Sequence, residues 1–589
     1  MARRNSLRAL TALSALLLTR LVLADAYDPP ANYYSTATGT GEALKSQLTT
    51  IMSTGHVLRS YGDFRYSAAI TDADPNVPGH ILLVYNRASV PATWDSGATW
   101  SREHTWPDSR QPQDASNSAT GAIADPFMLR PINQSINSSR GNSPYGLDST
   151  TGSYGPVAGG YYYPGDADKG DIARAQFYAA TRWSSLDLNL VDTLPTGFQM
   201  GDLSSLVNWN YLDVPDTFER RRNQTIYSQT LNPTYYTNNR NAYIDHPEFV
   251  WSVFVDQMND SQIVIDGADV ATDGSSTVNL DLGRVYVGGA VPGPQNFTLD
   301  KLGDDGTYFS VATSGDATSS LNERFNAFRN GAPDSRTLQV GLNSSTASSG
   351  IKSGTVIIDN LDVTTEGGLG HGANDGNDVL NLSLAVVDHP IASFSIDEAL
   401  SDITIDLGVV PLGEQASTSF LISNLLAAGA PSFAADLDLD SISGSGDTEA
   451  FFTELAAFSG MAQGDFESFD AFFAPTNIGE FSAVFTLNLS DEDLPGEETQ
   501  TLILNLLAKS VLAGDFNIDG VVDAADYVVW RDGLDTIYTL DDYDMWLNHF
   551  GQTAGEAALA PTAVPEPSCI LLLIGAACVI GLQRQRVAR

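Results

Sequence analysis

The most informative segment of this 589-residue chain reads Trp100-Ser101-Arg102-Glu103-His104-Thr105-Trp106-Pro107. A histidine can act as a general base near neutral pH, and the neighbouring glutamate offers a hard oxygen ligand to a divalent cation. Adjacent side chains of a strand point to opposite faces, so a site that uses both Glu103 and His104 requires a turn or a bulge. Taken alone, the triplet Arg102-Glu103-His104 is explained better as an ordinary surface cluster than as a catalytic site.

Other segments that are rich in Arg, Asn and Asp accompany this one in the first half of the chain. They are Tyr33-Tyr34 and residues 125–131 (DPFMLRP), 137–142 (NSSRGN), 169–174 (KGDIAR), 218–223 (FERRRN) and 239–248 (NRNAYIDHPE). In this order the segments resemble the endonuclease I family of secreted, non-specific bacterial nucleases, which belongs to the ββα-metal (His-Me finger) superfamily. The resemblance runs over residues 33–248, under half of the chain.

The resemblance implies a role for each residue of the site. Glu103 and Asn137 would bind one Mg²⁺ or Mn²⁺, and His104 would deprotonate the water that attacks phosphorus. The metal would neutralise charge on the scissile phosphate and help the 3′-oxygen to leave, which yields 5′-phosphate ends. Arg140 is expected to clamp the phosphate, with Arg174 as the alternative. Further substrate contacts are expected from Arg102, Arg130, Lys169 and Arg174.

Some of these side chains have a structural explanation that competes with the functional one. Salt bridges to Asp168 or Asp171 compete with phosphate contacts for Lys169 and Arg174. The three consecutive arginines at 220–222 form either a stripe that faces nucleic acid or the solvated face of a helix.

Other side chains are expected to be structural. Helices are predicted over 172–183, with Asp171 as its cap, and over 218–227. Trp100 and Trp106 are predicted to be core residues, and His246 a helix-entry residue. Many relatives carry a histidine where this chain has Phe127, so a supporting polar group is expected to be missing there. Disulfides cannot brace this domain, because both cysteines follow residue 568.

The charge of the chain argues at first against a nucleic acid partner. Acidic residues outnumber basic ones by 72 to 30, which gives a net charge of −42, and a polyanion repels nucleic acid at long range. The excess is unevenly placed: residues 25–258 carry 15 basic and 24 acidic side chains, and residues 259–589 carry 11 and 48. The acidic half is therefore expected to weaken nucleic acid binding mainly at low salt.

The sequence predicts a multidomain fold that begins with an α+β ββα-metal nuclease domain over 27–258. From about residue 260 short alternating strands and Gly, Ser, Asp and Asn turns predominate. Asp281-Leu282-Gly283 recurs at 406–408, and the strand-like segment 354–358 recurs at 479–484, both with an offset of 125. We expect two β-sandwich domains, 259–390 and 391–511, that either bind extracellular polysaccharide or act as spacers.

A small helical module is expected over 512–552. Oxygen-bearing residues fill the ligand positions of a calcium loop, with Gly520 at its sharp turn. The predicted Ca²⁺ ligands are Asp515, Asn517, Asp519, Val521 through its carbonyl, Asp523 and Asp526. Asp526 at the last position makes the loop resemble a dockerin, but no second loop is recognisable. The module therefore either binds a cohesin-like partner or is a calcium-stabilised structural repeat.

Both ends of the chain resemble export signals. Residues 1–26 have the basic start, apolar run and small residues of a cleavable signal peptide. A linker is predicted over 553–563. Residues 564–589 resemble the PEP-CTERM sorting signal, with Pro565-Glu566-Pro567, an apolar stretch predicted to be a transmembrane helix, and a basic tail; a plain membrane anchor is the alternative. We expect a bacterial protein at the cell surface or outside the cell, transiently held in the membrane.

Two functions are therefore compared. The first is an exported, Mg²⁺-dependent, non-specific endonuclease that cleaves DNA and possibly RNA. The second is a surface adhesion or scaffold protein whose nuclease-like domain is inactive. Glu103, His104 and Asn137 are all present, which favours the enzyme. No recognition helix for base edges is apparent, and phosphate contacts carry no sequence information.

Overall fold

The computed structural model describes residues 25–331, 333–364, 375–426 and 433–555. Their contacts form two compact units. The first unit contains the described chain up to Leu282 together with residues 292–344 and 353–383. The second contains residues 283–291 and 345–352 and the described chain from Leu384 onward. The predicted nuclease domain and most of the first sandwich thus share one unit.

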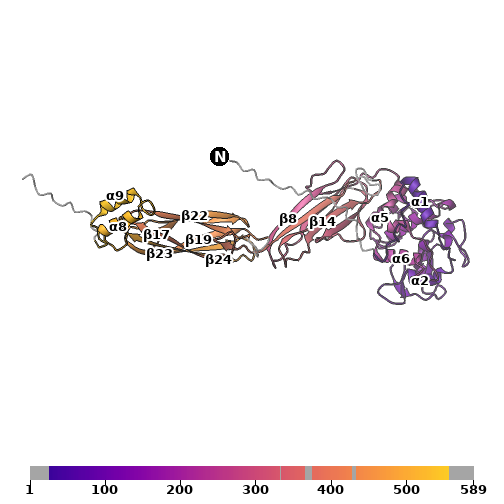
Figure 1. Ribbon diagram of the computed structural model, residues 1–589. Coiled ribbons are helices and arrows are strands. Elements are labelled where there is room, and N and C mark those ends of the chain that lie inside the picture. The colour runs from indigo at the N-terminus through magenta and orange to yellow at the C-terminus, as the bar shows by residue number, and fades with distance from the viewer. Residues whose placement is uncertain (1–24, 332, 365–374, 427–432, 556–589) are drawn as a thin grey trace, which may run out of the picture. The chain divides into compact units, whose positions relative to one another are not determined.

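Helices dominate the N-terminal region, residues 25–258 (Figure 1). They are α1 Gly41–Ser53, α2 Phe64–Thr71, α3 Gln134–Arg140, α4 Lys169–Arg182, α5 Leu203–Leu212, α6 Thr217–Tyr227 and α7 Ala242–Asp245. The two predicted helices are confirmed as α4 and α6. Asp171 is not the cap of α4, because the helix begins earlier and includes this residue in its first turn. All residues from Gly170 to Thr181 are buried, so α4 is the central helix of the region.

Three two-stranded sheets complete this region. Strand β1 His80–Leu82 pairs with β2 Ser89–Pro91, β3 Ser101–His104 with β4 Leu129–Ile132, and β5 Gly155–Pro156 with β6 Tyr162–Tyr163. Helix α3 follows β4 after one residue, and Asn133 caps it by accepting from the backbone N–H groups of Ser135 and Ile136. The consecutive elements β3, β4 and α3 form the expected strand–strand–helix arrangement.

The first sandwich has one sheet of five strands and one of four. Its strands are β7 Gln262–Ile265, β8 Thr277–Tyr286, β9 Gln295–Leu302, β10 Thr307–Gly315, β11 Ala317–Ser319, β12 Asn326–Phe328, β13 Asp334–Leu342, β14 Gly350–Asn360 and β15 Asp378–Val387. Their order is β12-β10-β14-β15-β8 in one sheet and β11-β13-β9-β7 in the other.

The second sandwich repeats this topology strand for strand. Its strands are β16 Ala392–Ser393, β17 Asp402–Pro411, β18 Ala416–Asn424, β19 Leu437–Gly446, β20 Phe451–Thr453, β21 Phe458–Met461, β22 Phe466–Phe473, β23 Gly479–Asp491 and β24 Thr499–Val511. The sheets are ordered β21-β19-β23-β24-β17 and β20-β22-β18-β16. The two repeated glycines, Gly283 and Gly408, lie at positive φ in the matching edge strands β8 and β17. The predicted internal repeat is therefore confirmed.

The two sandwiches differ in where their apolar residues are buried. Both sheets of the second sandwich enclose a core of their own, which includes Phe420, Phe473 and Leu504. In the first unit, Tyr308 and Phe325 of the first sandwich belong to the same apolar cluster as residues of α1, α4 and α5. The Tyr308 hydroxyl also donates to the carbonyl oxygen of Asn210. A fragment that ends at residue 258 would expose this part of the core.

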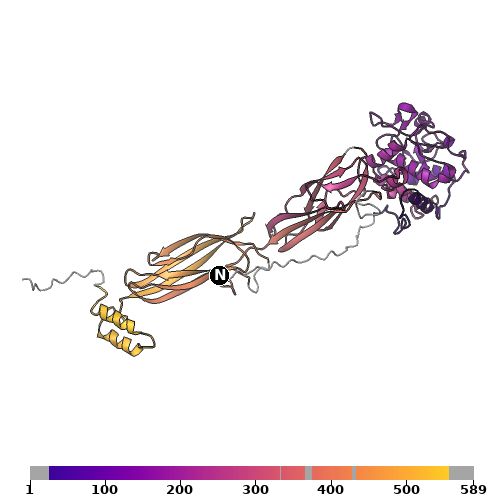
Figure 2. The ribbon, with the colours of Figure 1, turned by 90° about the horizontal axis from the view of Figure 1, so that it is seen from above.

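Helices α8 Ala524–Gly533 and α9 Leu540–His549 lie side by side in the second unit, as Figure 1 and Figure 2 both show. Aromatic contacts join them, including Trp530 with Tyr543 at a centroid distance of 4.9 Å. The predicted helical module is thus present. Across the described ranges no helix is long and apolar enough to span a bilayer. The predicted signal peptide up to residue 24 and the predicted sorting signal at 564–589 lie outside these ranges, as does most of the predicted linker.

Candidate active site

Strand β3 carries both principal candidates, Glu103 and His104. It pairs with β4 in a regular antiparallel register, with Glu103 opposite Arg130 and His104 opposite Leu129. The turn or bulge that a shared face would require is therefore absent. Because side chains alternate along a regular strand, Glu103 and His104 point to opposite sides of β3.

His104 is held in one orientation by contacts on its side of the strand. Its Nε2 lies 2.9 Å from the carbonyl oxygen of Ile123, in the turn Ala122–Ala124. A carbonyl only accepts, so Nε2 carries the proton and Nδ1 is left with a lone pair. Among the described residues no hydrogen bond to Nδ1 is found. The ring stacks on Tyr61 at 4.9 Å, and burial lowers the pKa of His104 below its usual 6.5. A neutral imidazole with a free Nδ1 can accept a proton.

Glu103 is surrounded by tyrosines and an arginine on the other side of β3. Its side chain is almost completely buried, and Oε1 accepts from the Tyr85 hydroxyl at 2.7 Å. Tyr85 in turn contacts the Tyr145 hydroxyl. Arg140 Nε lies 3.5 Å from Glu103 Oε1. Burial raises the pKa of Glu103, and Arg140 and Tyr85 offset this only in part.

Asn137 of α3 lies against the start of β3. Its Nδ2 donates to Ser101 Oγ at 3.2 Å and to the Arg102 carbonyl oxygen at 3.4 Å. These two hydrogen bonds orient the Asn137 amide so that Oδ1 points away from the two acceptors. Ser101 and Glu103 alternate with Arg102 along the strand, which places Asn137 near the face that carries Glu103.

The donor set of this face fits a magnesium ion held by few protein ligands. Glu103 Oε2 receives no hydrogen bond from any residue in the described ranges, and Asn137 offers an amide oxygen. Mg²⁺ prefers such hard oxygens and commonly takes one or two from the protein, with water and phosphate supplying the rest. In the described ranges no group of three or more His, Cys, Asp or Glu side chains is arranged to hold a metal. A two-metal clamp is therefore not supported here.

Arg140 does not occupy the position of a phosphate clamp. It is 1 % exposed, and its guanidinium donates to the carbonyl oxygens of His104 at 3.2 Å and Thr105 at 2.9 Å. Burial opposes its charge, but Tyr145 and Glu103 keep the pKa of Arg140 above its usual value. The predicted clamp is thus a buried group that fixes the end of β3.

Three of the four residues predicted to contact substrate are tied to carboxylates instead. Arg130 is buried and contacts Asp72 at 3.1 Å and Asp171 at 3.3 Å. Arg174 is fully buried and pairs with Glu219 at 2.6 Å. These two arginines are structural, because their carboxylate partners are buried beside them.

Lys169 Nζ is 3.1 Å from Asp166, a partner that differs from the two expected. Arg102, the fourth predicted substrate contact, is partly exposed and lies on the His104 side of β3. It is the one member of the predicted set that remains placed to meet a phosphate.

The three consecutive arginines of α6 are neither a solvated face nor a nucleic acid-facing stripe. Arg220 is buried against Asp28 at 3.3 Å, and Arg222 is buried against Asp72 at 2.9 Å. Arg221 donates to the Ala73 carbonyl oxygen. Their partners lie about 150 residues or more away in the sequence, so the pattern RRR could not reveal them.

Other expectations are resolved by burial. Trp100 and Trp106 are fully buried, as predicted. Phe127 packs on Tyr178 at 4.8 Å in the apolar core, which explains an apolar side chain there. His246 contacts Glu248 at 2.9 Å. It follows α7 and precedes the helical residues 249–255, to which its carbonyl oxygen is bonded through the Phe249 N–H, so it is a helix-entry residue as predicted.

The structure adds three groups that the sequence did not indicate. Tyr85 contacts Glu103, Tyr61 stacks on His104, and Ile123 fixes the imidazole through its carbonyl oxygen. Tyr61 and Tyr85 lie outside the segments that carry the resemblance, so the sequence does not indicate their contacts with His104 and Glu103. The Ile123 contact uses a backbone carbonyl oxygen, which every residue has, so the sequence could not indicate it either.

The predicted calcium loop folds around two buried carboxylates. Asp515 accepts from the backbone N–H groups of Asp519 and Gly520, and Asp526 accepts from those of Asn517 and Asp523. Burial raises the pKa of Asp515, and the nearby carboxylates of Asp526 and Asp519 add to this. Gly520 lies in this turn at a φ of +84°, and in the described ranges no group of three or more acidic or histidine side chains is arranged to hold a metal.

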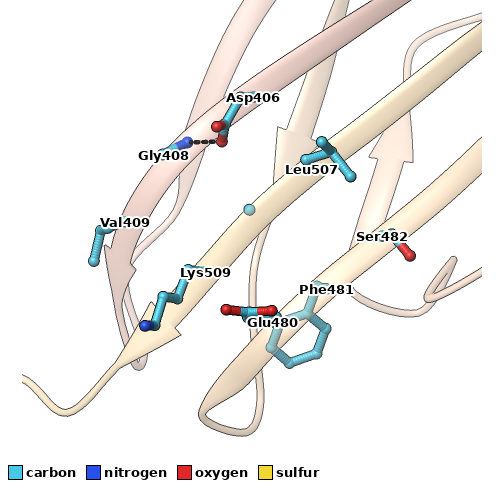
Figure 3. Close-up of a pocket in the computed structure, with 9 residues that line it drawn as sticks. Asp406, Gly408, Val409, Glu480, Phe481, Ser482, Leu507 and Lys509 are labelled. Carbon is cyan, nitrogen blue, oxygen red and sulfur yellow. Dashed lines mark hydrogen bonds between the residues drawn. The ribbon is translucent and has the colours of Figure 1, made fainter. Parts of the chain in front are cut away.

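A surface groove lies on the second unit (Figure 3). Its lining residues include Asp406, Glu480 and Lys509, from β17, β23 and β24. The pairing of β17 with β24 shifts by a residue between Asp406 and Val409, and Gly408 at positive φ permits this bulge. No histidine lines the groove, so the catalytic candidates remain those of β3 and α3.

Comparison with known proteins agrees with this placement. The family model described as Endonuclease I matches residues 40–248. An extracellular ribonuclease of Bacillus amyloliquefaciens is 38% identical over 232 residues, which is 37% of this chain and 76% of that protein. An extracellular ribonuclease of Bacillus subtilis (strain 168) is 36% identical over 247 residues, covering 40% and 82%.

Among solved structures, the ASH / PapD-like domain of human CEP192 matches at 12% identity over 21% of this chain and 88% of that domain. Its TM-score is 0.16, so this likeness carries no argument about the fold. The Bacillus relatives are matched over more than three quarters of their length, and the residues that the family model matches include β3, β4 and α3 with Glu103, His104 and Asn137. The chain therefore belongs to the endonuclease I family.

Proposed function

We propose that the protein is an exported, metal-dependent nuclease that hydrolyses phosphodiester bonds of RNA and DNA without sequence preference. The observation that carries this proposal is the state of His104. Its protonated Nε2 is bonded to a carbonyl oxygen, its Nδ1 is free, and its pKa is lowered. These are the requirements for a general base that works near neutral pH.

The reaction would begin at His104 Nδ1, which takes a proton from the attacking water as oxygen approaches phosphorus. The Ile123 carbonyl oxygen stabilises the resulting imidazolium because it continues to accept from Nε2. Arg140 holds the backbone of His104 and Thr105 and thereby fixes the position of the ring. Arg102, on the same side of β3, is the cation best placed to contact the substrate phosphate.

Glu103 and Asn137 would hold the Mg²⁺ or Mn²⁺ ion. This ion supplies charge neutralisation on the scissile phosphate and the leaving 3′-oxygen. Tyr85 and Arg140 orient the Glu103 carboxylate from behind, as outer groups of metal sites generally do. The products would carry 5′-phosphates.

The alternative is a surface adhesion or scaffold protein with an inactive nuclease-like domain. The intact set of Glu103, His104 and Asn137 argues against it. The test is cleavage of RNA, single-stranded DNA and plasmid DNA by the purified protein, residues 27–555, with Mg²⁺ or with EDTA. Absence of Mg²⁺-dependent cleavage on every substrate would refute the nuclease and support the scaffold.

Export is supported by the Bacillus relatives, both of which are named extracellular ribonucleases. We also propose transient membrane attachment through residues 564–589, which fractionation of cells that express the full chain would test. A polysaccharide or cohesin-like ligand for the C-terminal half remains a proposal without a contact to support it.

We propose further that the loop at 515–526 binds Ca²⁺. Its support is the spacing of the oxygen-bearing residues in the sequence and the turn at Gly520; in the described ranges no three acidic or histidine side chains are already arranged around a cation. Binding would require the carboxylate oxygens of Asp515 and Asp526 to exchange amide partners for the ion. Addition of Ca²⁺ should raise the unfolding temperature of the second unit, and Asp526→Asn should abolish this shift. An equal temperature with Ca²⁺ and with EDTA would contradict the proposal.

A further inference from the structure

The first unit has a small group of arginines that are not neutralised. Of the 15 basic side chains between residues 25 and 258, nine form ion pairs with carboxylates. Within the described ranges no ion pair is found for the other six. Three of these six lie in the segment around Tyr61 or against it: Arg59, Arg65 and Arg102. In a chain with a net charge of −42, this is a local excess of positive charge.

These arginines are held rigidly by backbone oxygens. Arg102 donates to the Tyr61 carbonyl oxygen at 2.7 Å, and Arg65 donates to that of Gly62 at 2.8 Å. Arg59 donates to the carbonyl oxygen of Tyr236 at 2.7 Å. Arg102 and Arg65 thus bind neighbouring carbonyl oxygens, and in the described ranges neither pairs with a carboxylate, which favours an anion there.

Aromatic rings lie among the same arginines. The Arg102 guanidinium is 3.6 Å from the ring centroid of Tyr61. Tyr66 is 51 % exposed, stacks on Tyr235 at 6.1 Å with an interplanar angle of 19°, and has Arg65 at 5.4 Å from its ring. Arg59 lies over the ring of Tyr236 at 5.0 Å.

This surface, formed by Arg59, Tyr61, Arg65, Tyr66, Arg102 and Tyr235, is called the Tyr–Arg surface below. Its inner end is the catalytic base, because Tyr61 also stacks on His104 at 4.9 Å. A chain that lies along it would therefore pass directly to the reacting centre. The carboxylate of Asp63, which lies in the same segment, accepts from the backbone N–H of Ser60.

We propose that the Tyr–Arg surface binds single-stranded nucleic acid and makes unpaired strands the preferred substrate of this nuclease. Exposed tyrosines stack on bases that are not already stacked in a duplex, and arginines contact the backbone phosphates between them. A duplex keeps its bases inside and could use only the arginines. The inference rests on the proposed nuclease function, whose substrate class it specifies.

The test measures binding in EDTA, so that no cleavage occurs and the readout is independent of activity. Fluorescein-labelled 12-nucleotide RNA and DNA single strands, and a DNA duplex of the same sequence, are titrated with the purified protein. Tyr66→Ala removes one exposed ring and should weaken single-strand binding by about tenfold, the order expected for one stacked base. Duplex binding should be unchanged. Tyr154→Ala, an exposed tyrosine away from this surface, is the matched control and should change neither.

A second variant separates charge from stacking. Arg65→Gln should reduce the slope of log Kd against log salt by about 0.7 for single strands, the value for one phosphate contact, and leave Tyr66 in place. Comparison of the RNA and DNA arms shows which sugar is preferred. Equal losses on single strands and duplex in Tyr66→Ala, or no loss on either, would overturn the proposal.

The two proposals fail in different ways. A wild-type protein that cleaves with Mg²⁺ while Tyr66→Ala binds single strands normally would refute the Tyr–Arg surface alone. A wild-type protein that binds single strands through Tyr66 and cleaves nothing would refute the nuclease function alone.

Discussion

His104 and Glu103 are sequence neighbours on β3, but the two sides of the strand surround them with different groups. On one side the imidazole meets a tyrosine ring and one carbonyl oxygen, next to arginines for which the described ranges contain no carboxylate partner. On the other side the carboxylate is buried among tyrosine hydroxyls and the buried Arg140. A regular ladder of four residue pairs thus keeps the imidazole and the carboxylate in separate surroundings.

The regular strand overturns the expectation that a site using both residues requires a turn or a bulge. His104 is the last residue of β3, and Arg140 contacts both the Glu103 carboxylate and the His104 carbonyl oxygen, so both side chains border the end of the strand that Arg140 fixes. The imidazole must stay neutral to accept a proton, and a carboxylate in contact with it would raise its pKa. The strand itself keeps the two side chains on opposite faces. Burial can then shift the pKa of each group separately: it lowers the pKa of His104 and raises the pKa of Glu103.

The largest effect is expected from removal of the base. His104→Ala should reduce kcat by about 10²–10⁴-fold, the range typical for a general base, while single-strand binding and the unfolding temperature change little. His80→Ala, on a neighbouring strand, is the control and should cleave at the wild-type rate. A His104→Ala protein that cleaves as fast as wild type would show that the two faces have been assigned wrongly.

On the opposite face, Glu103→Gln should lower the rate by about 100-fold and raise the Mg²⁺ concentration needed for half-maximal activity. The side chain keeps its shape and its bond from Tyr85, but it loses the charge that holds a cation. It also leaves the buried Arg140 without its ion pair, which should lower stability. A metal titration of activity, with thermal unfolding measured in parallel, distinguishes the two effects. An unchanged Mg²⁺ requirement would rule out Glu103 as the ligand.

Arg140→Lys tests whether Arg140 positions the strand or contacts the phosphate. A lysine cannot reach both the His104 and Thr105 carbonyl oxygens, so kcat should fall about tenfold, as for other groups that support a metal ligand. KM should stay the same. A rise in KM at unchanged kcat would instead support the prediction from the sequence that Arg140 contacts the substrate phosphate.

The smallest effect concerns the pH dependence of kcat/KM. Because the pKa of His104 is lowered, its base form should persist below pH 6.5, and activity should fall only as pH drops further. Tyr61→Ala removes the ring that covers His104, so the acid limb should move upward toward 6.5. Tyr66→Ala does not touch His104 and should leave the limb in place. An acid limb unaffected by Tyr61→Ala would mean that burial by this ring does not set the pKa.

The local parts of the fold and site could be predicted from the sequence. Glu103, His104 and Asn137 lie in short segments whose spacing is itself the signal, and the 125-residue offset predicted two sandwiches that share one topology. Arginine roles could not be predicted in this way. Whether Arg174 or Arg222 meets solvent depends on Glu219 and Asp72, which are 45 and 150 residues away. The sequence does not show which of these distant residues come close together in the fold.

The same limitation applies to domain boundaries. A change in residue composition near residue 260 marks where helices give way to strands, but it does not show which strand residues pack against the helices. Tyr308 and Phe325 have the alternation of ordinary sandwich residues, and only the fold places them in the helical core.

Their position there has a consequence for the order in which the protein folds. The apolar cluster around α4 and α5 is completed by Tyr308, Phe325 and Val363, the last of which emerges about a hundred residues after α7 during synthesis. Since long-range contacts form late, the full stability of the helical region is delayed until the first sandwich has left the ribosome.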